Sequence, residues 1–532
     1  MDKDIRHYAE GGMTMSECVK YQGQNILLQT TKGYVKGYTF KGIHVFKGIP
    51  YAKARRFHAP EPVETWEGVL DATSYGYVCP LLQKEKPQGE LKIPHRYWLE
   101  DENCQNLNIW TPGCDGEKRP VFVWLHGGGF ESGSSVEQVA YDGANLSKYG
   151  DAVVISLNHR LNVLGFFDLS DFGEEYKNSG NAGMDDIIAA LKWIRENVAL
   201  FGGDPDNVTL FGQSGGGAKI TTLLQMPAAD CLYAKGICMS GMLENGMQDC
   251  KGSGKELAQA VMKELEIEDV KELEKIPYKR LAQAFLKVRP SFQKSGGYIA
   301  GNPLPNEFYA GNPLHHGFRT ETSGVPLLVG TVFAEFAGFM RSLDRENYIS
   351  EDAQYSAVTK ELGEEAVQKL KPLFTKAYPQ RPFSDILSLD YLFRYPTQEY
   401  IQKRGALNKA TYAYLFDYDF PVEGGTAAWH CADIPFVFHN VNLVEYAPDE
   451  SALKLEEIIF HCVMAFARTG NPNVEGLPDW KPSTASEEFT MIFGEQVRTA
   501  VNHDRELIPV FRNYMSKRFE KMKEENRDQL QH

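Results

Sequence analysis

One short segment, residues 212–216, combines residue types and spacing that could carry out covalent chemistry. It reads Gly-Gln-Ser-Gly-Gly, it follows a β-like run at 207–211, and a predicted helix at 218–224 comes directly after it. A serine on a sharp glycine-rich turn between a strand and a helix is typical of a nucleophile elbow, which projects the hydroxyl above the sheet. Flanking glycines let the backbone pass through the bend without a Cβ clash. The pattern predicts acyl transfer through an ester formed on Ser214.

A serine hydroxyl is a weak nucleophile and needs a general base, usually a histidine that a carboxylate orients. Nucleophile elbows of this kind are followed along the chain by the acid and then by the histidine. The histidines after the last predicted strand, 411–416, are His430, His439, His461, His503 and His532. We favour His430, because it lies in the glycine-rich loop 423–430 that leaves this strand. His461 has the helical spacing of an apolar stretch, so we expect it in the core.

Glu335 is the predicted acid. It follows the predicted strand 325–330 by five residues and lies between Ala334 and Phe336. A carboxylate with apolar neighbours must face a partner or lose its hydration at high cost. The alternative is a glutamate at the rim of the site.

A second glycine-rich segment could stabilise the oxyanion of an acyl-transfer reaction. Residues 126–130 read His-Gly-Gly-Gly-Phe and follow directly after the predicted strand 120–125. Three glycines let several amides point into one concavity, as in the oxyanion loops of esterases and lipases. Gly215, the residue after the predicted nucleophile, would supply a further amide.

The elements around these motifs predict a large, mostly parallel sheet flanked by helices. Continuous apolar runs such as 120–125 and 152–157 suit parallel strands buried on both faces, whereas 26–40 alternates as antiparallel strands do. Helical periodicity at 184–199 and 255–265 separates the strands. The segment 243–320 breaks this rhythm. We interpret it as an insertion that roofs the site within a single domain spanning residues 1–532.

Composition and net charge limit the kinds of partner that the protein is expected to bind. The chain has 532 residues and a net charge of −15, which argues against nucleic acid or an anionic membrane as the main partner. No run approaches the ~18–20 apolar residues of a membrane span. The first residues lack the apolar core of a signal peptide, so we expect a cytoplasmic location. The oligomeric state, monomer or dimer, stays open.

Rival sites fit less well. Gly212 and Gly217 have the spacing of a phosphate-binding loop, but Lys219 comes one residue late and no Ser or Thr follows it. No His-Glu-x-x-His cluster suggests a metal hydrolase, and we expect neither a metal nor a cofactor. An amidase or lactonase using the same residues remains an alternative, as does a catalytically silent binding protein.

Segments along most of the chain resemble the type-B carboxylesterase family, which includes the cholinesterases. The matching segments are 46–52, 56–57, 102–108, 158–161, 181–186, 201–205, 240–241 and 430–438. The resemblance implies an α/β-hydrolase fold and a carboxylic-ester hydrolase. The site residues that it implies are a triad of Ser214, Glu335 and His430 with an oxyanion hole from Gly128, Gly129 and Gly215. It also implies ion pairs Arg56–Glu102 and Arg160–Asp186, and a Cys79–Cys104 disulfide under oxidising conditions.

The departures from the family pattern indicate the type of substrate. The family elbow usually reads Gly-Glu-Ser-Ala-Gly, whereas Gln213 replaces the acid here and Gly215 replaces the alanine. A cationic substrate would therefore be attracted less, and we expect neutral esters with small or aromatic groups rather than choline esters. For an apolar substrate pocket we consider Phe130, Phe292 and Phe336, each of which could equally pack in the core.

Overall fold

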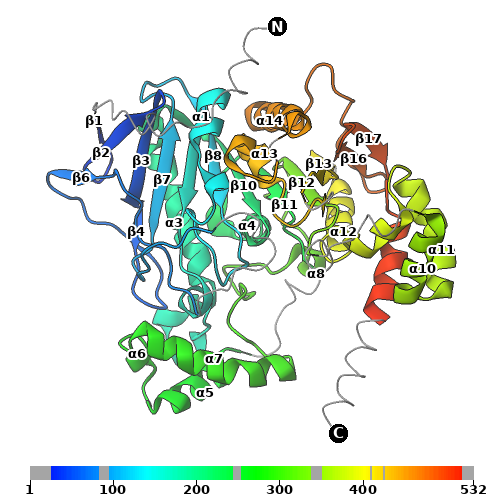
Figure 1. Cartoon of the computed structure of the whole chain (residues 1–532). Coiled ribbons are helices and arrows are strands. Elements are labelled where there is room, and N and C mark those ends of the chain that lie inside the picture. Colours follow the sequence, from blue (N-terminus) through cyan, green and yellow to red (C-terminus); the bar gives the residue numbers. More distant parts are fainter. Residues whose placement is uncertain are drawn as a thin grey trace.

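The computed structural model of the chain describes residues 25–82, 95–243, 253–336, 350–407, 410–422, 426–447 and 449–517. Residues 244–252 of the predicted insertion and 423–425 of the predicted histidine loop lie outside the described residues. A large twisted sheet crosses the described part of the molecule, and helices cover both of its faces (Figure 1).

The sheet has thirteen strands in the order β1-β2-β3-β7-β9-β8-β10-β11-β12-β13-β16-β17, with β6 paired to β2. The bounds are β1 Asn25–Gln29, β2 Tyr34–Phe40, β3 Ile43–Pro50, β6 Val69–Asp71, β7 Asn106–Thr111, β8 Arg119–Leu125, β9 Val153–Leu157, β10 Gly203–Gln213, β11 Lys235–Met239, β12 Leu327–Val332, β13 Thr411–Phe416, β16 Phe489–Phe493 and β17 Arg498–Val501. Two small sheets pair β4 (Ala52–Lys53) with β5 (Glu61–Pro62) and β14 (Asp419–Phe420) with β15 (Thr426–Ala427).

The strands from β9 through β16 are parallel, and the strands at both ends of the sheet pair antiparallel. Strands β9, β11, β12 and β13 are buried along their whole length. This burial explains their continuous apolar sequences, and the prediction of a mostly parallel sheet is confirmed. The carboxyl ends of parallel strands share one edge, where ligands bind in sheets of this type.

Alternate residues of β8 face opposite apolar layers. Phe122 and Trp124 belong to the layer that includes α14, whereas Val123 and Leu125 belong to the layer that includes α3. The principal helices are α1 Ala144–Gly150, α3 Ala182–Asn197, α4 Gly215–Leu223, α12 Arg394–Gly405, α13 Ile434–Phe438 and α14 Glu450–Thr469. Helices α1, α13 and α14 cover one face of the sheet, and α3, α4 and α12 cover the other. This packing fixes the strand ends that carry the predicted site.

Two helical regions extend from this core. Helices α5 (Lys255–Leu265), α6 (Val270–Leu273) and α7 (Tyr278–Ser295) lie together below the sheet in Figure 1, around an apolar cluster that also holds Phe57 and Phe167. Helices α10 (Glu351–Leu362) and α11 (Glu364–Ala377) lie at the right of Figure 1 and have a separate apolar cluster. The short helices α2 (Asn162–Gly165) and α8 (Pro313–His316) connect parts of the core.

The ion pairs implied by the resemblance are confirmed. Arg160 Nη2 lies 2.7 Å from Asp186 Oδ1, and Arg56 Nε donates to Glu102 Oε2 at 2.8 Å. Cys79 and Cys104 are both buried free thiols in this structure, so the implied disulfide is not formed.

One prediction about the core is wrong. His461 lies on α14 as its helical spacing predicts, but its side chain is 60% exposed and its Nε2 lies 3.6 Å from Glu457 Oε2. Periodicity identified the helix correctly and assigned this residue to the wrong face.

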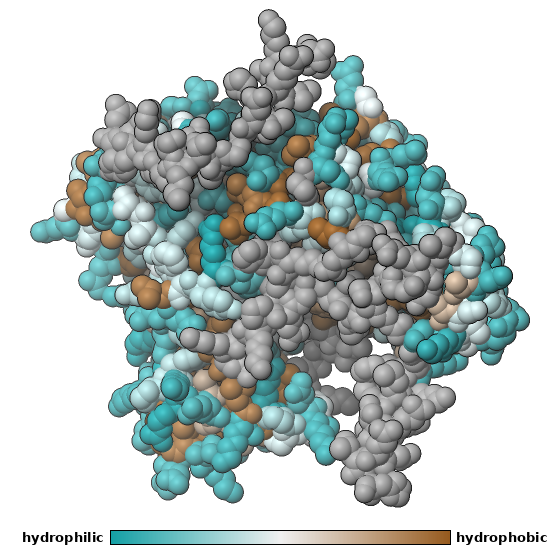
Figure 2. Space-filling model, viewed as in Figure 1, coloured by the Kyte–Doolittle hydropathy of each residue, from teal (hydrophilic) through white to brown (hydrophobic). Residues whose placement is uncertain are grey.

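The face shown in Figure 2 is largely hydrophilic, with apolar side chains in scattered groups. Among the described residues, no helix combines the length and the apolar character that crossing a bilayer requires.

Candidate active site

Ser214 lies at the turn between β10 and α4. Its backbone has φ 57° and ψ −124°, an uncommon conformation for a residue with a Cβ atom. Its N–H donates to Met239 O on β11 at 2.8 Å, and Ala218 N donates to Ser214 O at 3.0 Å. A Cβ atom at Gly212 would lie 2.6 Å from the backbone carbon of Gly216. The strained turn and the glycine contact that permits it are the features that the sequence predicts for a nucleophile elbow.

His430 and Glu335 form a buried pair. Nδ1 of His430 lies 2.5 Å from Glu335 Oε2, and the backbone N–H of His430 donates to Glu335 O at 3.1 Å. The two residues are 3% and 0% exposed. An Nδ1–H that donates to the carboxylate leaves Nε2 as the basic nitrogen. The pairing is the arrangement expected for a histidine base and the acid that orients it.

Ser240 supports this pair, a role that the sequence alone did not reveal. Its Oγ donates to Glu335 Oε1 at 2.6 Å, and Val332 N donates to the same oxygen at 3.0 Å. Ser240, Glu335 and Cys431 all have positive φ, of 47°, 23° and 77°. Strained residues of this kind persist where the surrounding structure holds them, often at functional sites. The only sequence signal was the Ser-Gly pair at 240–241, one residue beyond the end of β11.

A cavity of about 290 Å³ brings the predicted residues together. Its lining includes Ser214, His430, Gly128, Gly129, Gly215, Phe130, Gln213 and Phe336. Phe292 does not line it. Phe292 lies on α7 and packs against the apolar cluster of α5 to α7, so its place in a substrate pocket stays a prediction. Leu243 and Asn302, which flank these helices in the chain, do reach the cavity.

Two aromatic rings flank the imidazole of His430. The ring centroids of Phe336 and Phe393 lie 4.5 and 4.9 Å from it. Both phenylalanines line the cavity, and Phe393 was not predicted from the sequence. Apolar walls of this kind limit water around the imidazole and strengthen its electrostatic contacts.

The glycine loop faces the elbow at very short range. Gly128 and Gly129 have φ of 83° and 62°, and Glu131 N and Ser132 N donate to Gly128 O at 3.2 and 3.0 Å. A Cβ atom at Gly215 would lie within 3.0 Å of three backbone atoms of Gly129. The predicted oxyanion donors therefore sit in backbone contact at the N-terminus of α4, where the helix dipole favours negative charge.

Gln213 lies beside the imidazole. Its Nε2 is 3.3 and 3.4 Å from the two ring nitrogens of His430, and its Oε1 accepts from Cys431 Sγ at 3.1 Å. Gln213 is 1% exposed. A neutral amide thus occupies the position where the family resemblance leads one to expect a carboxylate.

Two further buried acids lie near Glu335. Burial, followed by the charge of Glu335, raises the pKa of Asp390 to about 8. Burial raises the pKa of Asp433 to about 7, although the hydroxyl of Tyr414 donates to it at 2.7 Å. At mildly acidic pH both acids are therefore protonated and uncharged. They then add no negative charge beside the pair of Glu335 and His430.

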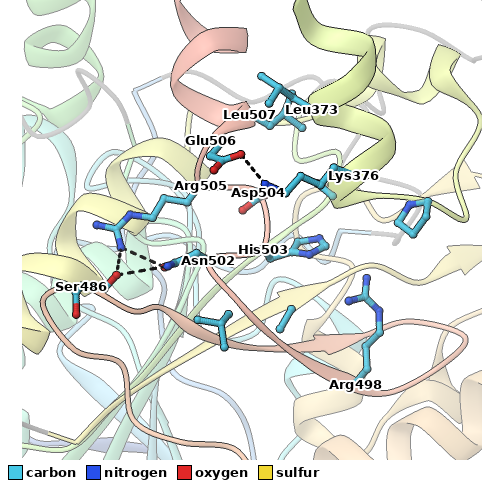
Figure 3. A pocket seen from close by; sticks show the side chains of 14 residues that line it. Leu373, Lys376, Ser486, Arg498, Asn502, His503, Asp504, Arg505, Glu506 and Leu507 are labelled. Atoms are coloured by element: carbon cyan, nitrogen blue, oxygen red, sulfur yellow. Dashed lines mark hydrogen bonds and ion pairs between the residues drawn. The ribbon is translucent and has the colours of Figure 1, made fainter.

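A second depression, of about 680 Å³, lies between α11 and β17 (Figure 3). Its charged side chains are largely engaged: Lys376 pairs with Glu506 at 2.7 Å, and Arg505 Nη1 donates to Ser486 O at 3.0 Å. None of the predicted site residues lines it. Size alone would favour this depression, but the predicted catalytic residues Ser214 and His430 line the smaller cavity.

The fold and this geometry define an α/β-hydrolase. Residues 24–524 match the sequence model of the carboxylesterase family, and the chain belongs to this family. It is 33% identical to the para-nitrobenzyl esterase of Bacillus subtilis over 88% of this chain and 95% of that protein. It is 32% identical to the phenmedipham hydrolase of Pseudarthrobacter oxydans, again over 88% and 95%.

Solved structures agree with this assignment. An esterase from the anaerobe Clostridium hathewayi, described as able to hydrolyse aliphatic aromatic polyesters, superposes with a TM-score of 0.90 at 45% identity over 93% of this chain and 99% of that chain. A structure of para-nitrobenzyl esterase gives a TM-score of 0.74 at 32% identity over 92% and 99%. The protein is a carboxylesterase.

Proposed function

We propose that the protein hydrolyses neutral carboxylic esters through an acyl-enzyme on Ser214. The observation that carries this proposal is the buried pair of His430 and Glu335, 2.5 Å apart, whose imidazole lines the same cavity as the strained Ser214. A base oriented by a carboxylate and a nucleophile on an elbow are the parts that acyl transfer requires.

The reaction has two halves. His430 Nε2 takes the proton of Ser214 as Oγ attacks the ester carbonyl, and the oxyanion is stabilised by the amides of Gly128, Gly129 and Gly215. The alcohol leaves with the proton from His430. Water then gives a proton to His430 and attacks the acyl-enzyme, and the carboxylic acid leaves as Ser214 regains its proton. Apart from the ester and water, these steps use only groups of the chain itself.

Aromatic or small neutral esters are the proposed substrates. Gln213 places an amide rather than a carboxylate beside the nucleophile, and Phe130, Phe336 and Phe393 supply apolar walls. The names of the relatives, para-nitrobenzyl esterase and phenmedipham hydrolase, and the polyester-hydrolysing neighbour point to aromatic groups. Leu243 and Asn302 in the cavity lining support the further proposal that the segment 243–320 covers the site.

The test is Ser214→Ala assayed on p-nitrophenyl butyrate, with Ser291→Ala, a serine on the exposed side of α7, as the matched control. We expect loss of turnover in the first variant and wild-type turnover in the second. Full activity of Ser214→Ala would refute the mechanism. A panel of esters, amides and lactones with matched acyl groups then separates esterase from amidase or lactonase activity.

A further inference from the structure

Lys219 is a fully buried lysine one turn into α4. It is 0% exposed, and its Nζ donates to the backbone oxygen of His126 at 2.8 Å. A buried ammonium is expensive unless it is paired. Burial lowers the pKa of Lys219 to about 7, and the charge of Glu137 opposes that shift. A lysine buried at this cost, five residues after the predicted nucleophile, calls for a function.

The bond of Lys219 connects two parts of the predicted active site. Lys219 and Ser214 belong to the same turn-and-helix unit, because Ser214 caps α4. His126 directly precedes the three glycines that include the predicted oxyanion donors. These glycines have no side chains to hold them, and two of them, Gly128 and Gly129, have positive φ. Ordering such a segment is entropically costly, so contacts at its edges decide its position.

The surroundings of Lys219 favour this backbone contact. Phe130, at the other end of the glycine run, presents its ring 5.8 Å from Nζ. The rings of His126 and His159 stack with centroids 5.1 Å apart, and burial, followed by the charge of Lys219, lowers the pKa of each well below its usual value. The lowered pKa of each histidine favours the neutral ring. Glu137 faces His95 Nδ1 at 3.1 Å. The ammonium thus contacts residues at both ends of the glycine loop.

We propose that Lys219 is a positioning residue for ester hydrolysis, which holds the glycine loop at its working distance from Ser214 through the carbonyl of His126. The proposal rests on the proposed function, since the loop matters only if it stabilises an oxyanion. The late lysine that excludes a phosphate-binding loop thereby acquires a role, because its Nζ contacts the carbonyl of His126 at the start of the glycine loop.

The experiment compares Lys219→Met, Lys219→Gln and Lys219→Arg with the wild type. Kinetics on p-nitrophenyl butyrate are normalised to active sites titrated with a fluorophosphonate. The inhibition constant of an alkyl trifluoromethyl ketone, whose adduct with a serine carries an oxyanion, is measured in parallel. Thermal melts report folding. Lys235→Met is the matched control, because Lys235 is a buried lysine at the start of β11, remote in sequence from the glycine loop.

For Lys219→Met we expect kcat and ketone affinity to fall together, by about 10- to 100-fold, with KM within about twofold of wild type. Lys219→Arg, which keeps a cationic donor, should retain more activity than Lys219→Met, and Lys235→Met should change only stability. Should methionine prevent folding, Lys219→Gln keeps a donor on a shorter chain and should show a smaller loss of the same kind.

The proposal is overturned if folded Lys219→Met or Lys219→Gln keeps wild-type kcat and ketone affinity, or if the variants differ only in melting temperature. Ser214→Ala in the same assays separates the two proposals. Activity that survives in Ser214→Ala defeats the proposed function itself, whereas an inactive Ser214→Ala beside fully active Lys219 variants defeats only the positioning role.

Discussion

Gly215→Ala is expected to damage the enzyme even though it restores the residue that the family elbow usually carries. A Cβ atom at Gly215 would lie within 3.0 Å of three backbone atoms of Gly129, whereas ordinary contact begins at 3.4 Å. The nearest of these atoms, Gly129 O, falls about 1.2 Å short of ordinary contact, and the atoms in the way are backbone, so the glycine loop must move by about 1 Å. Gly129 and Gly215 are both predicted oxyanion donors, so the displacement separates groups that must act together.

The size of the effect follows from this displacement. A misplacement of about 1 Å can reduce a rate by about 10²-fold, and loss of one oxyanion donor by about 10²–10³-fold. A partial displacement is therefore expected to lower kcat by about 10- to 100-fold, with little change in KM. The assay is steady-state hydrolysis of p-nitrophenyl butyrate, normalised to titrated active sites.

Gly324→Ala is the control for Gly215→Ala, because an added Cβ atom there meets no atom within 4 Å. It should leave kcat unchanged. If Gly215→Ala retains wild-type kcat, the glycine loop does not lie against the elbow in the way described, and the close packing of Gly129 on Gly215 has no functional weight.

Three other changes test the surroundings of the site. Ser240→Ala removes the 2.6 Å hydrogen bond to Glu335. We expect kcat to fall about tenfold, because a hydrogen bond to a charged group contributes about 1.5–3 kcal/mol. An unchanged pH–rate profile would argue against the support that Ser240 gives to Glu335. Arg160→Met leaves Asp186 buried without its partner and should lower the free energy of unfolding by about 3–5 kcal/mol in urea titrations. The raised pKa of Asp390, about 8, means that the folded protein keeps this proton up to about pH 8, whereas the unfolded chain releases it near pH 4. The free energy of unfolding therefore falls as pH rises from about 4 through 8. Asp390→Asn should therefore flatten the fall in unfolding free energy between pH 5 and 9, and an unaltered slope would contradict the assignment.

Local patterns predicted the elements that carry the chemistry. The buried parallel strands have continuous apolar sequences, and the elbow and the glycine loop each follow a strand end, so chain order and strand direction were enough to bring Ser214, His430 and Glu335 to one edge. The expected order of nucleophile, acid and histidine along the chain then selected Glu335 and His430. These features depend on neighbours in sequence, which is why they can be read without a structure.

Contacts between distant segments could not be predicted in the same way. Ser240, Phe393 and Lys219 acquire their roles from partners that other strands and loops bring close. His461 shows the converse error: a histidine at helical spacing fits both the core and the exposed face of a helix, and only the packing of α14 decides between them.

The most direct test of the mechanism is to trap the acyl-enzyme. The protein is mixed with p-nitrophenyl butyrate, quenched with acid during turnover, digested and analysed by mass spectrometry. We predict one butyryl group on the peptide that contains Ser214. In a His430→Ala variant the adduct would accumulate only if Ser214 can attack the ester without the base. Turnover with no adduct at Ser214, or an adduct on another residue that forms and decays at the rate of turnover, would contradict the account.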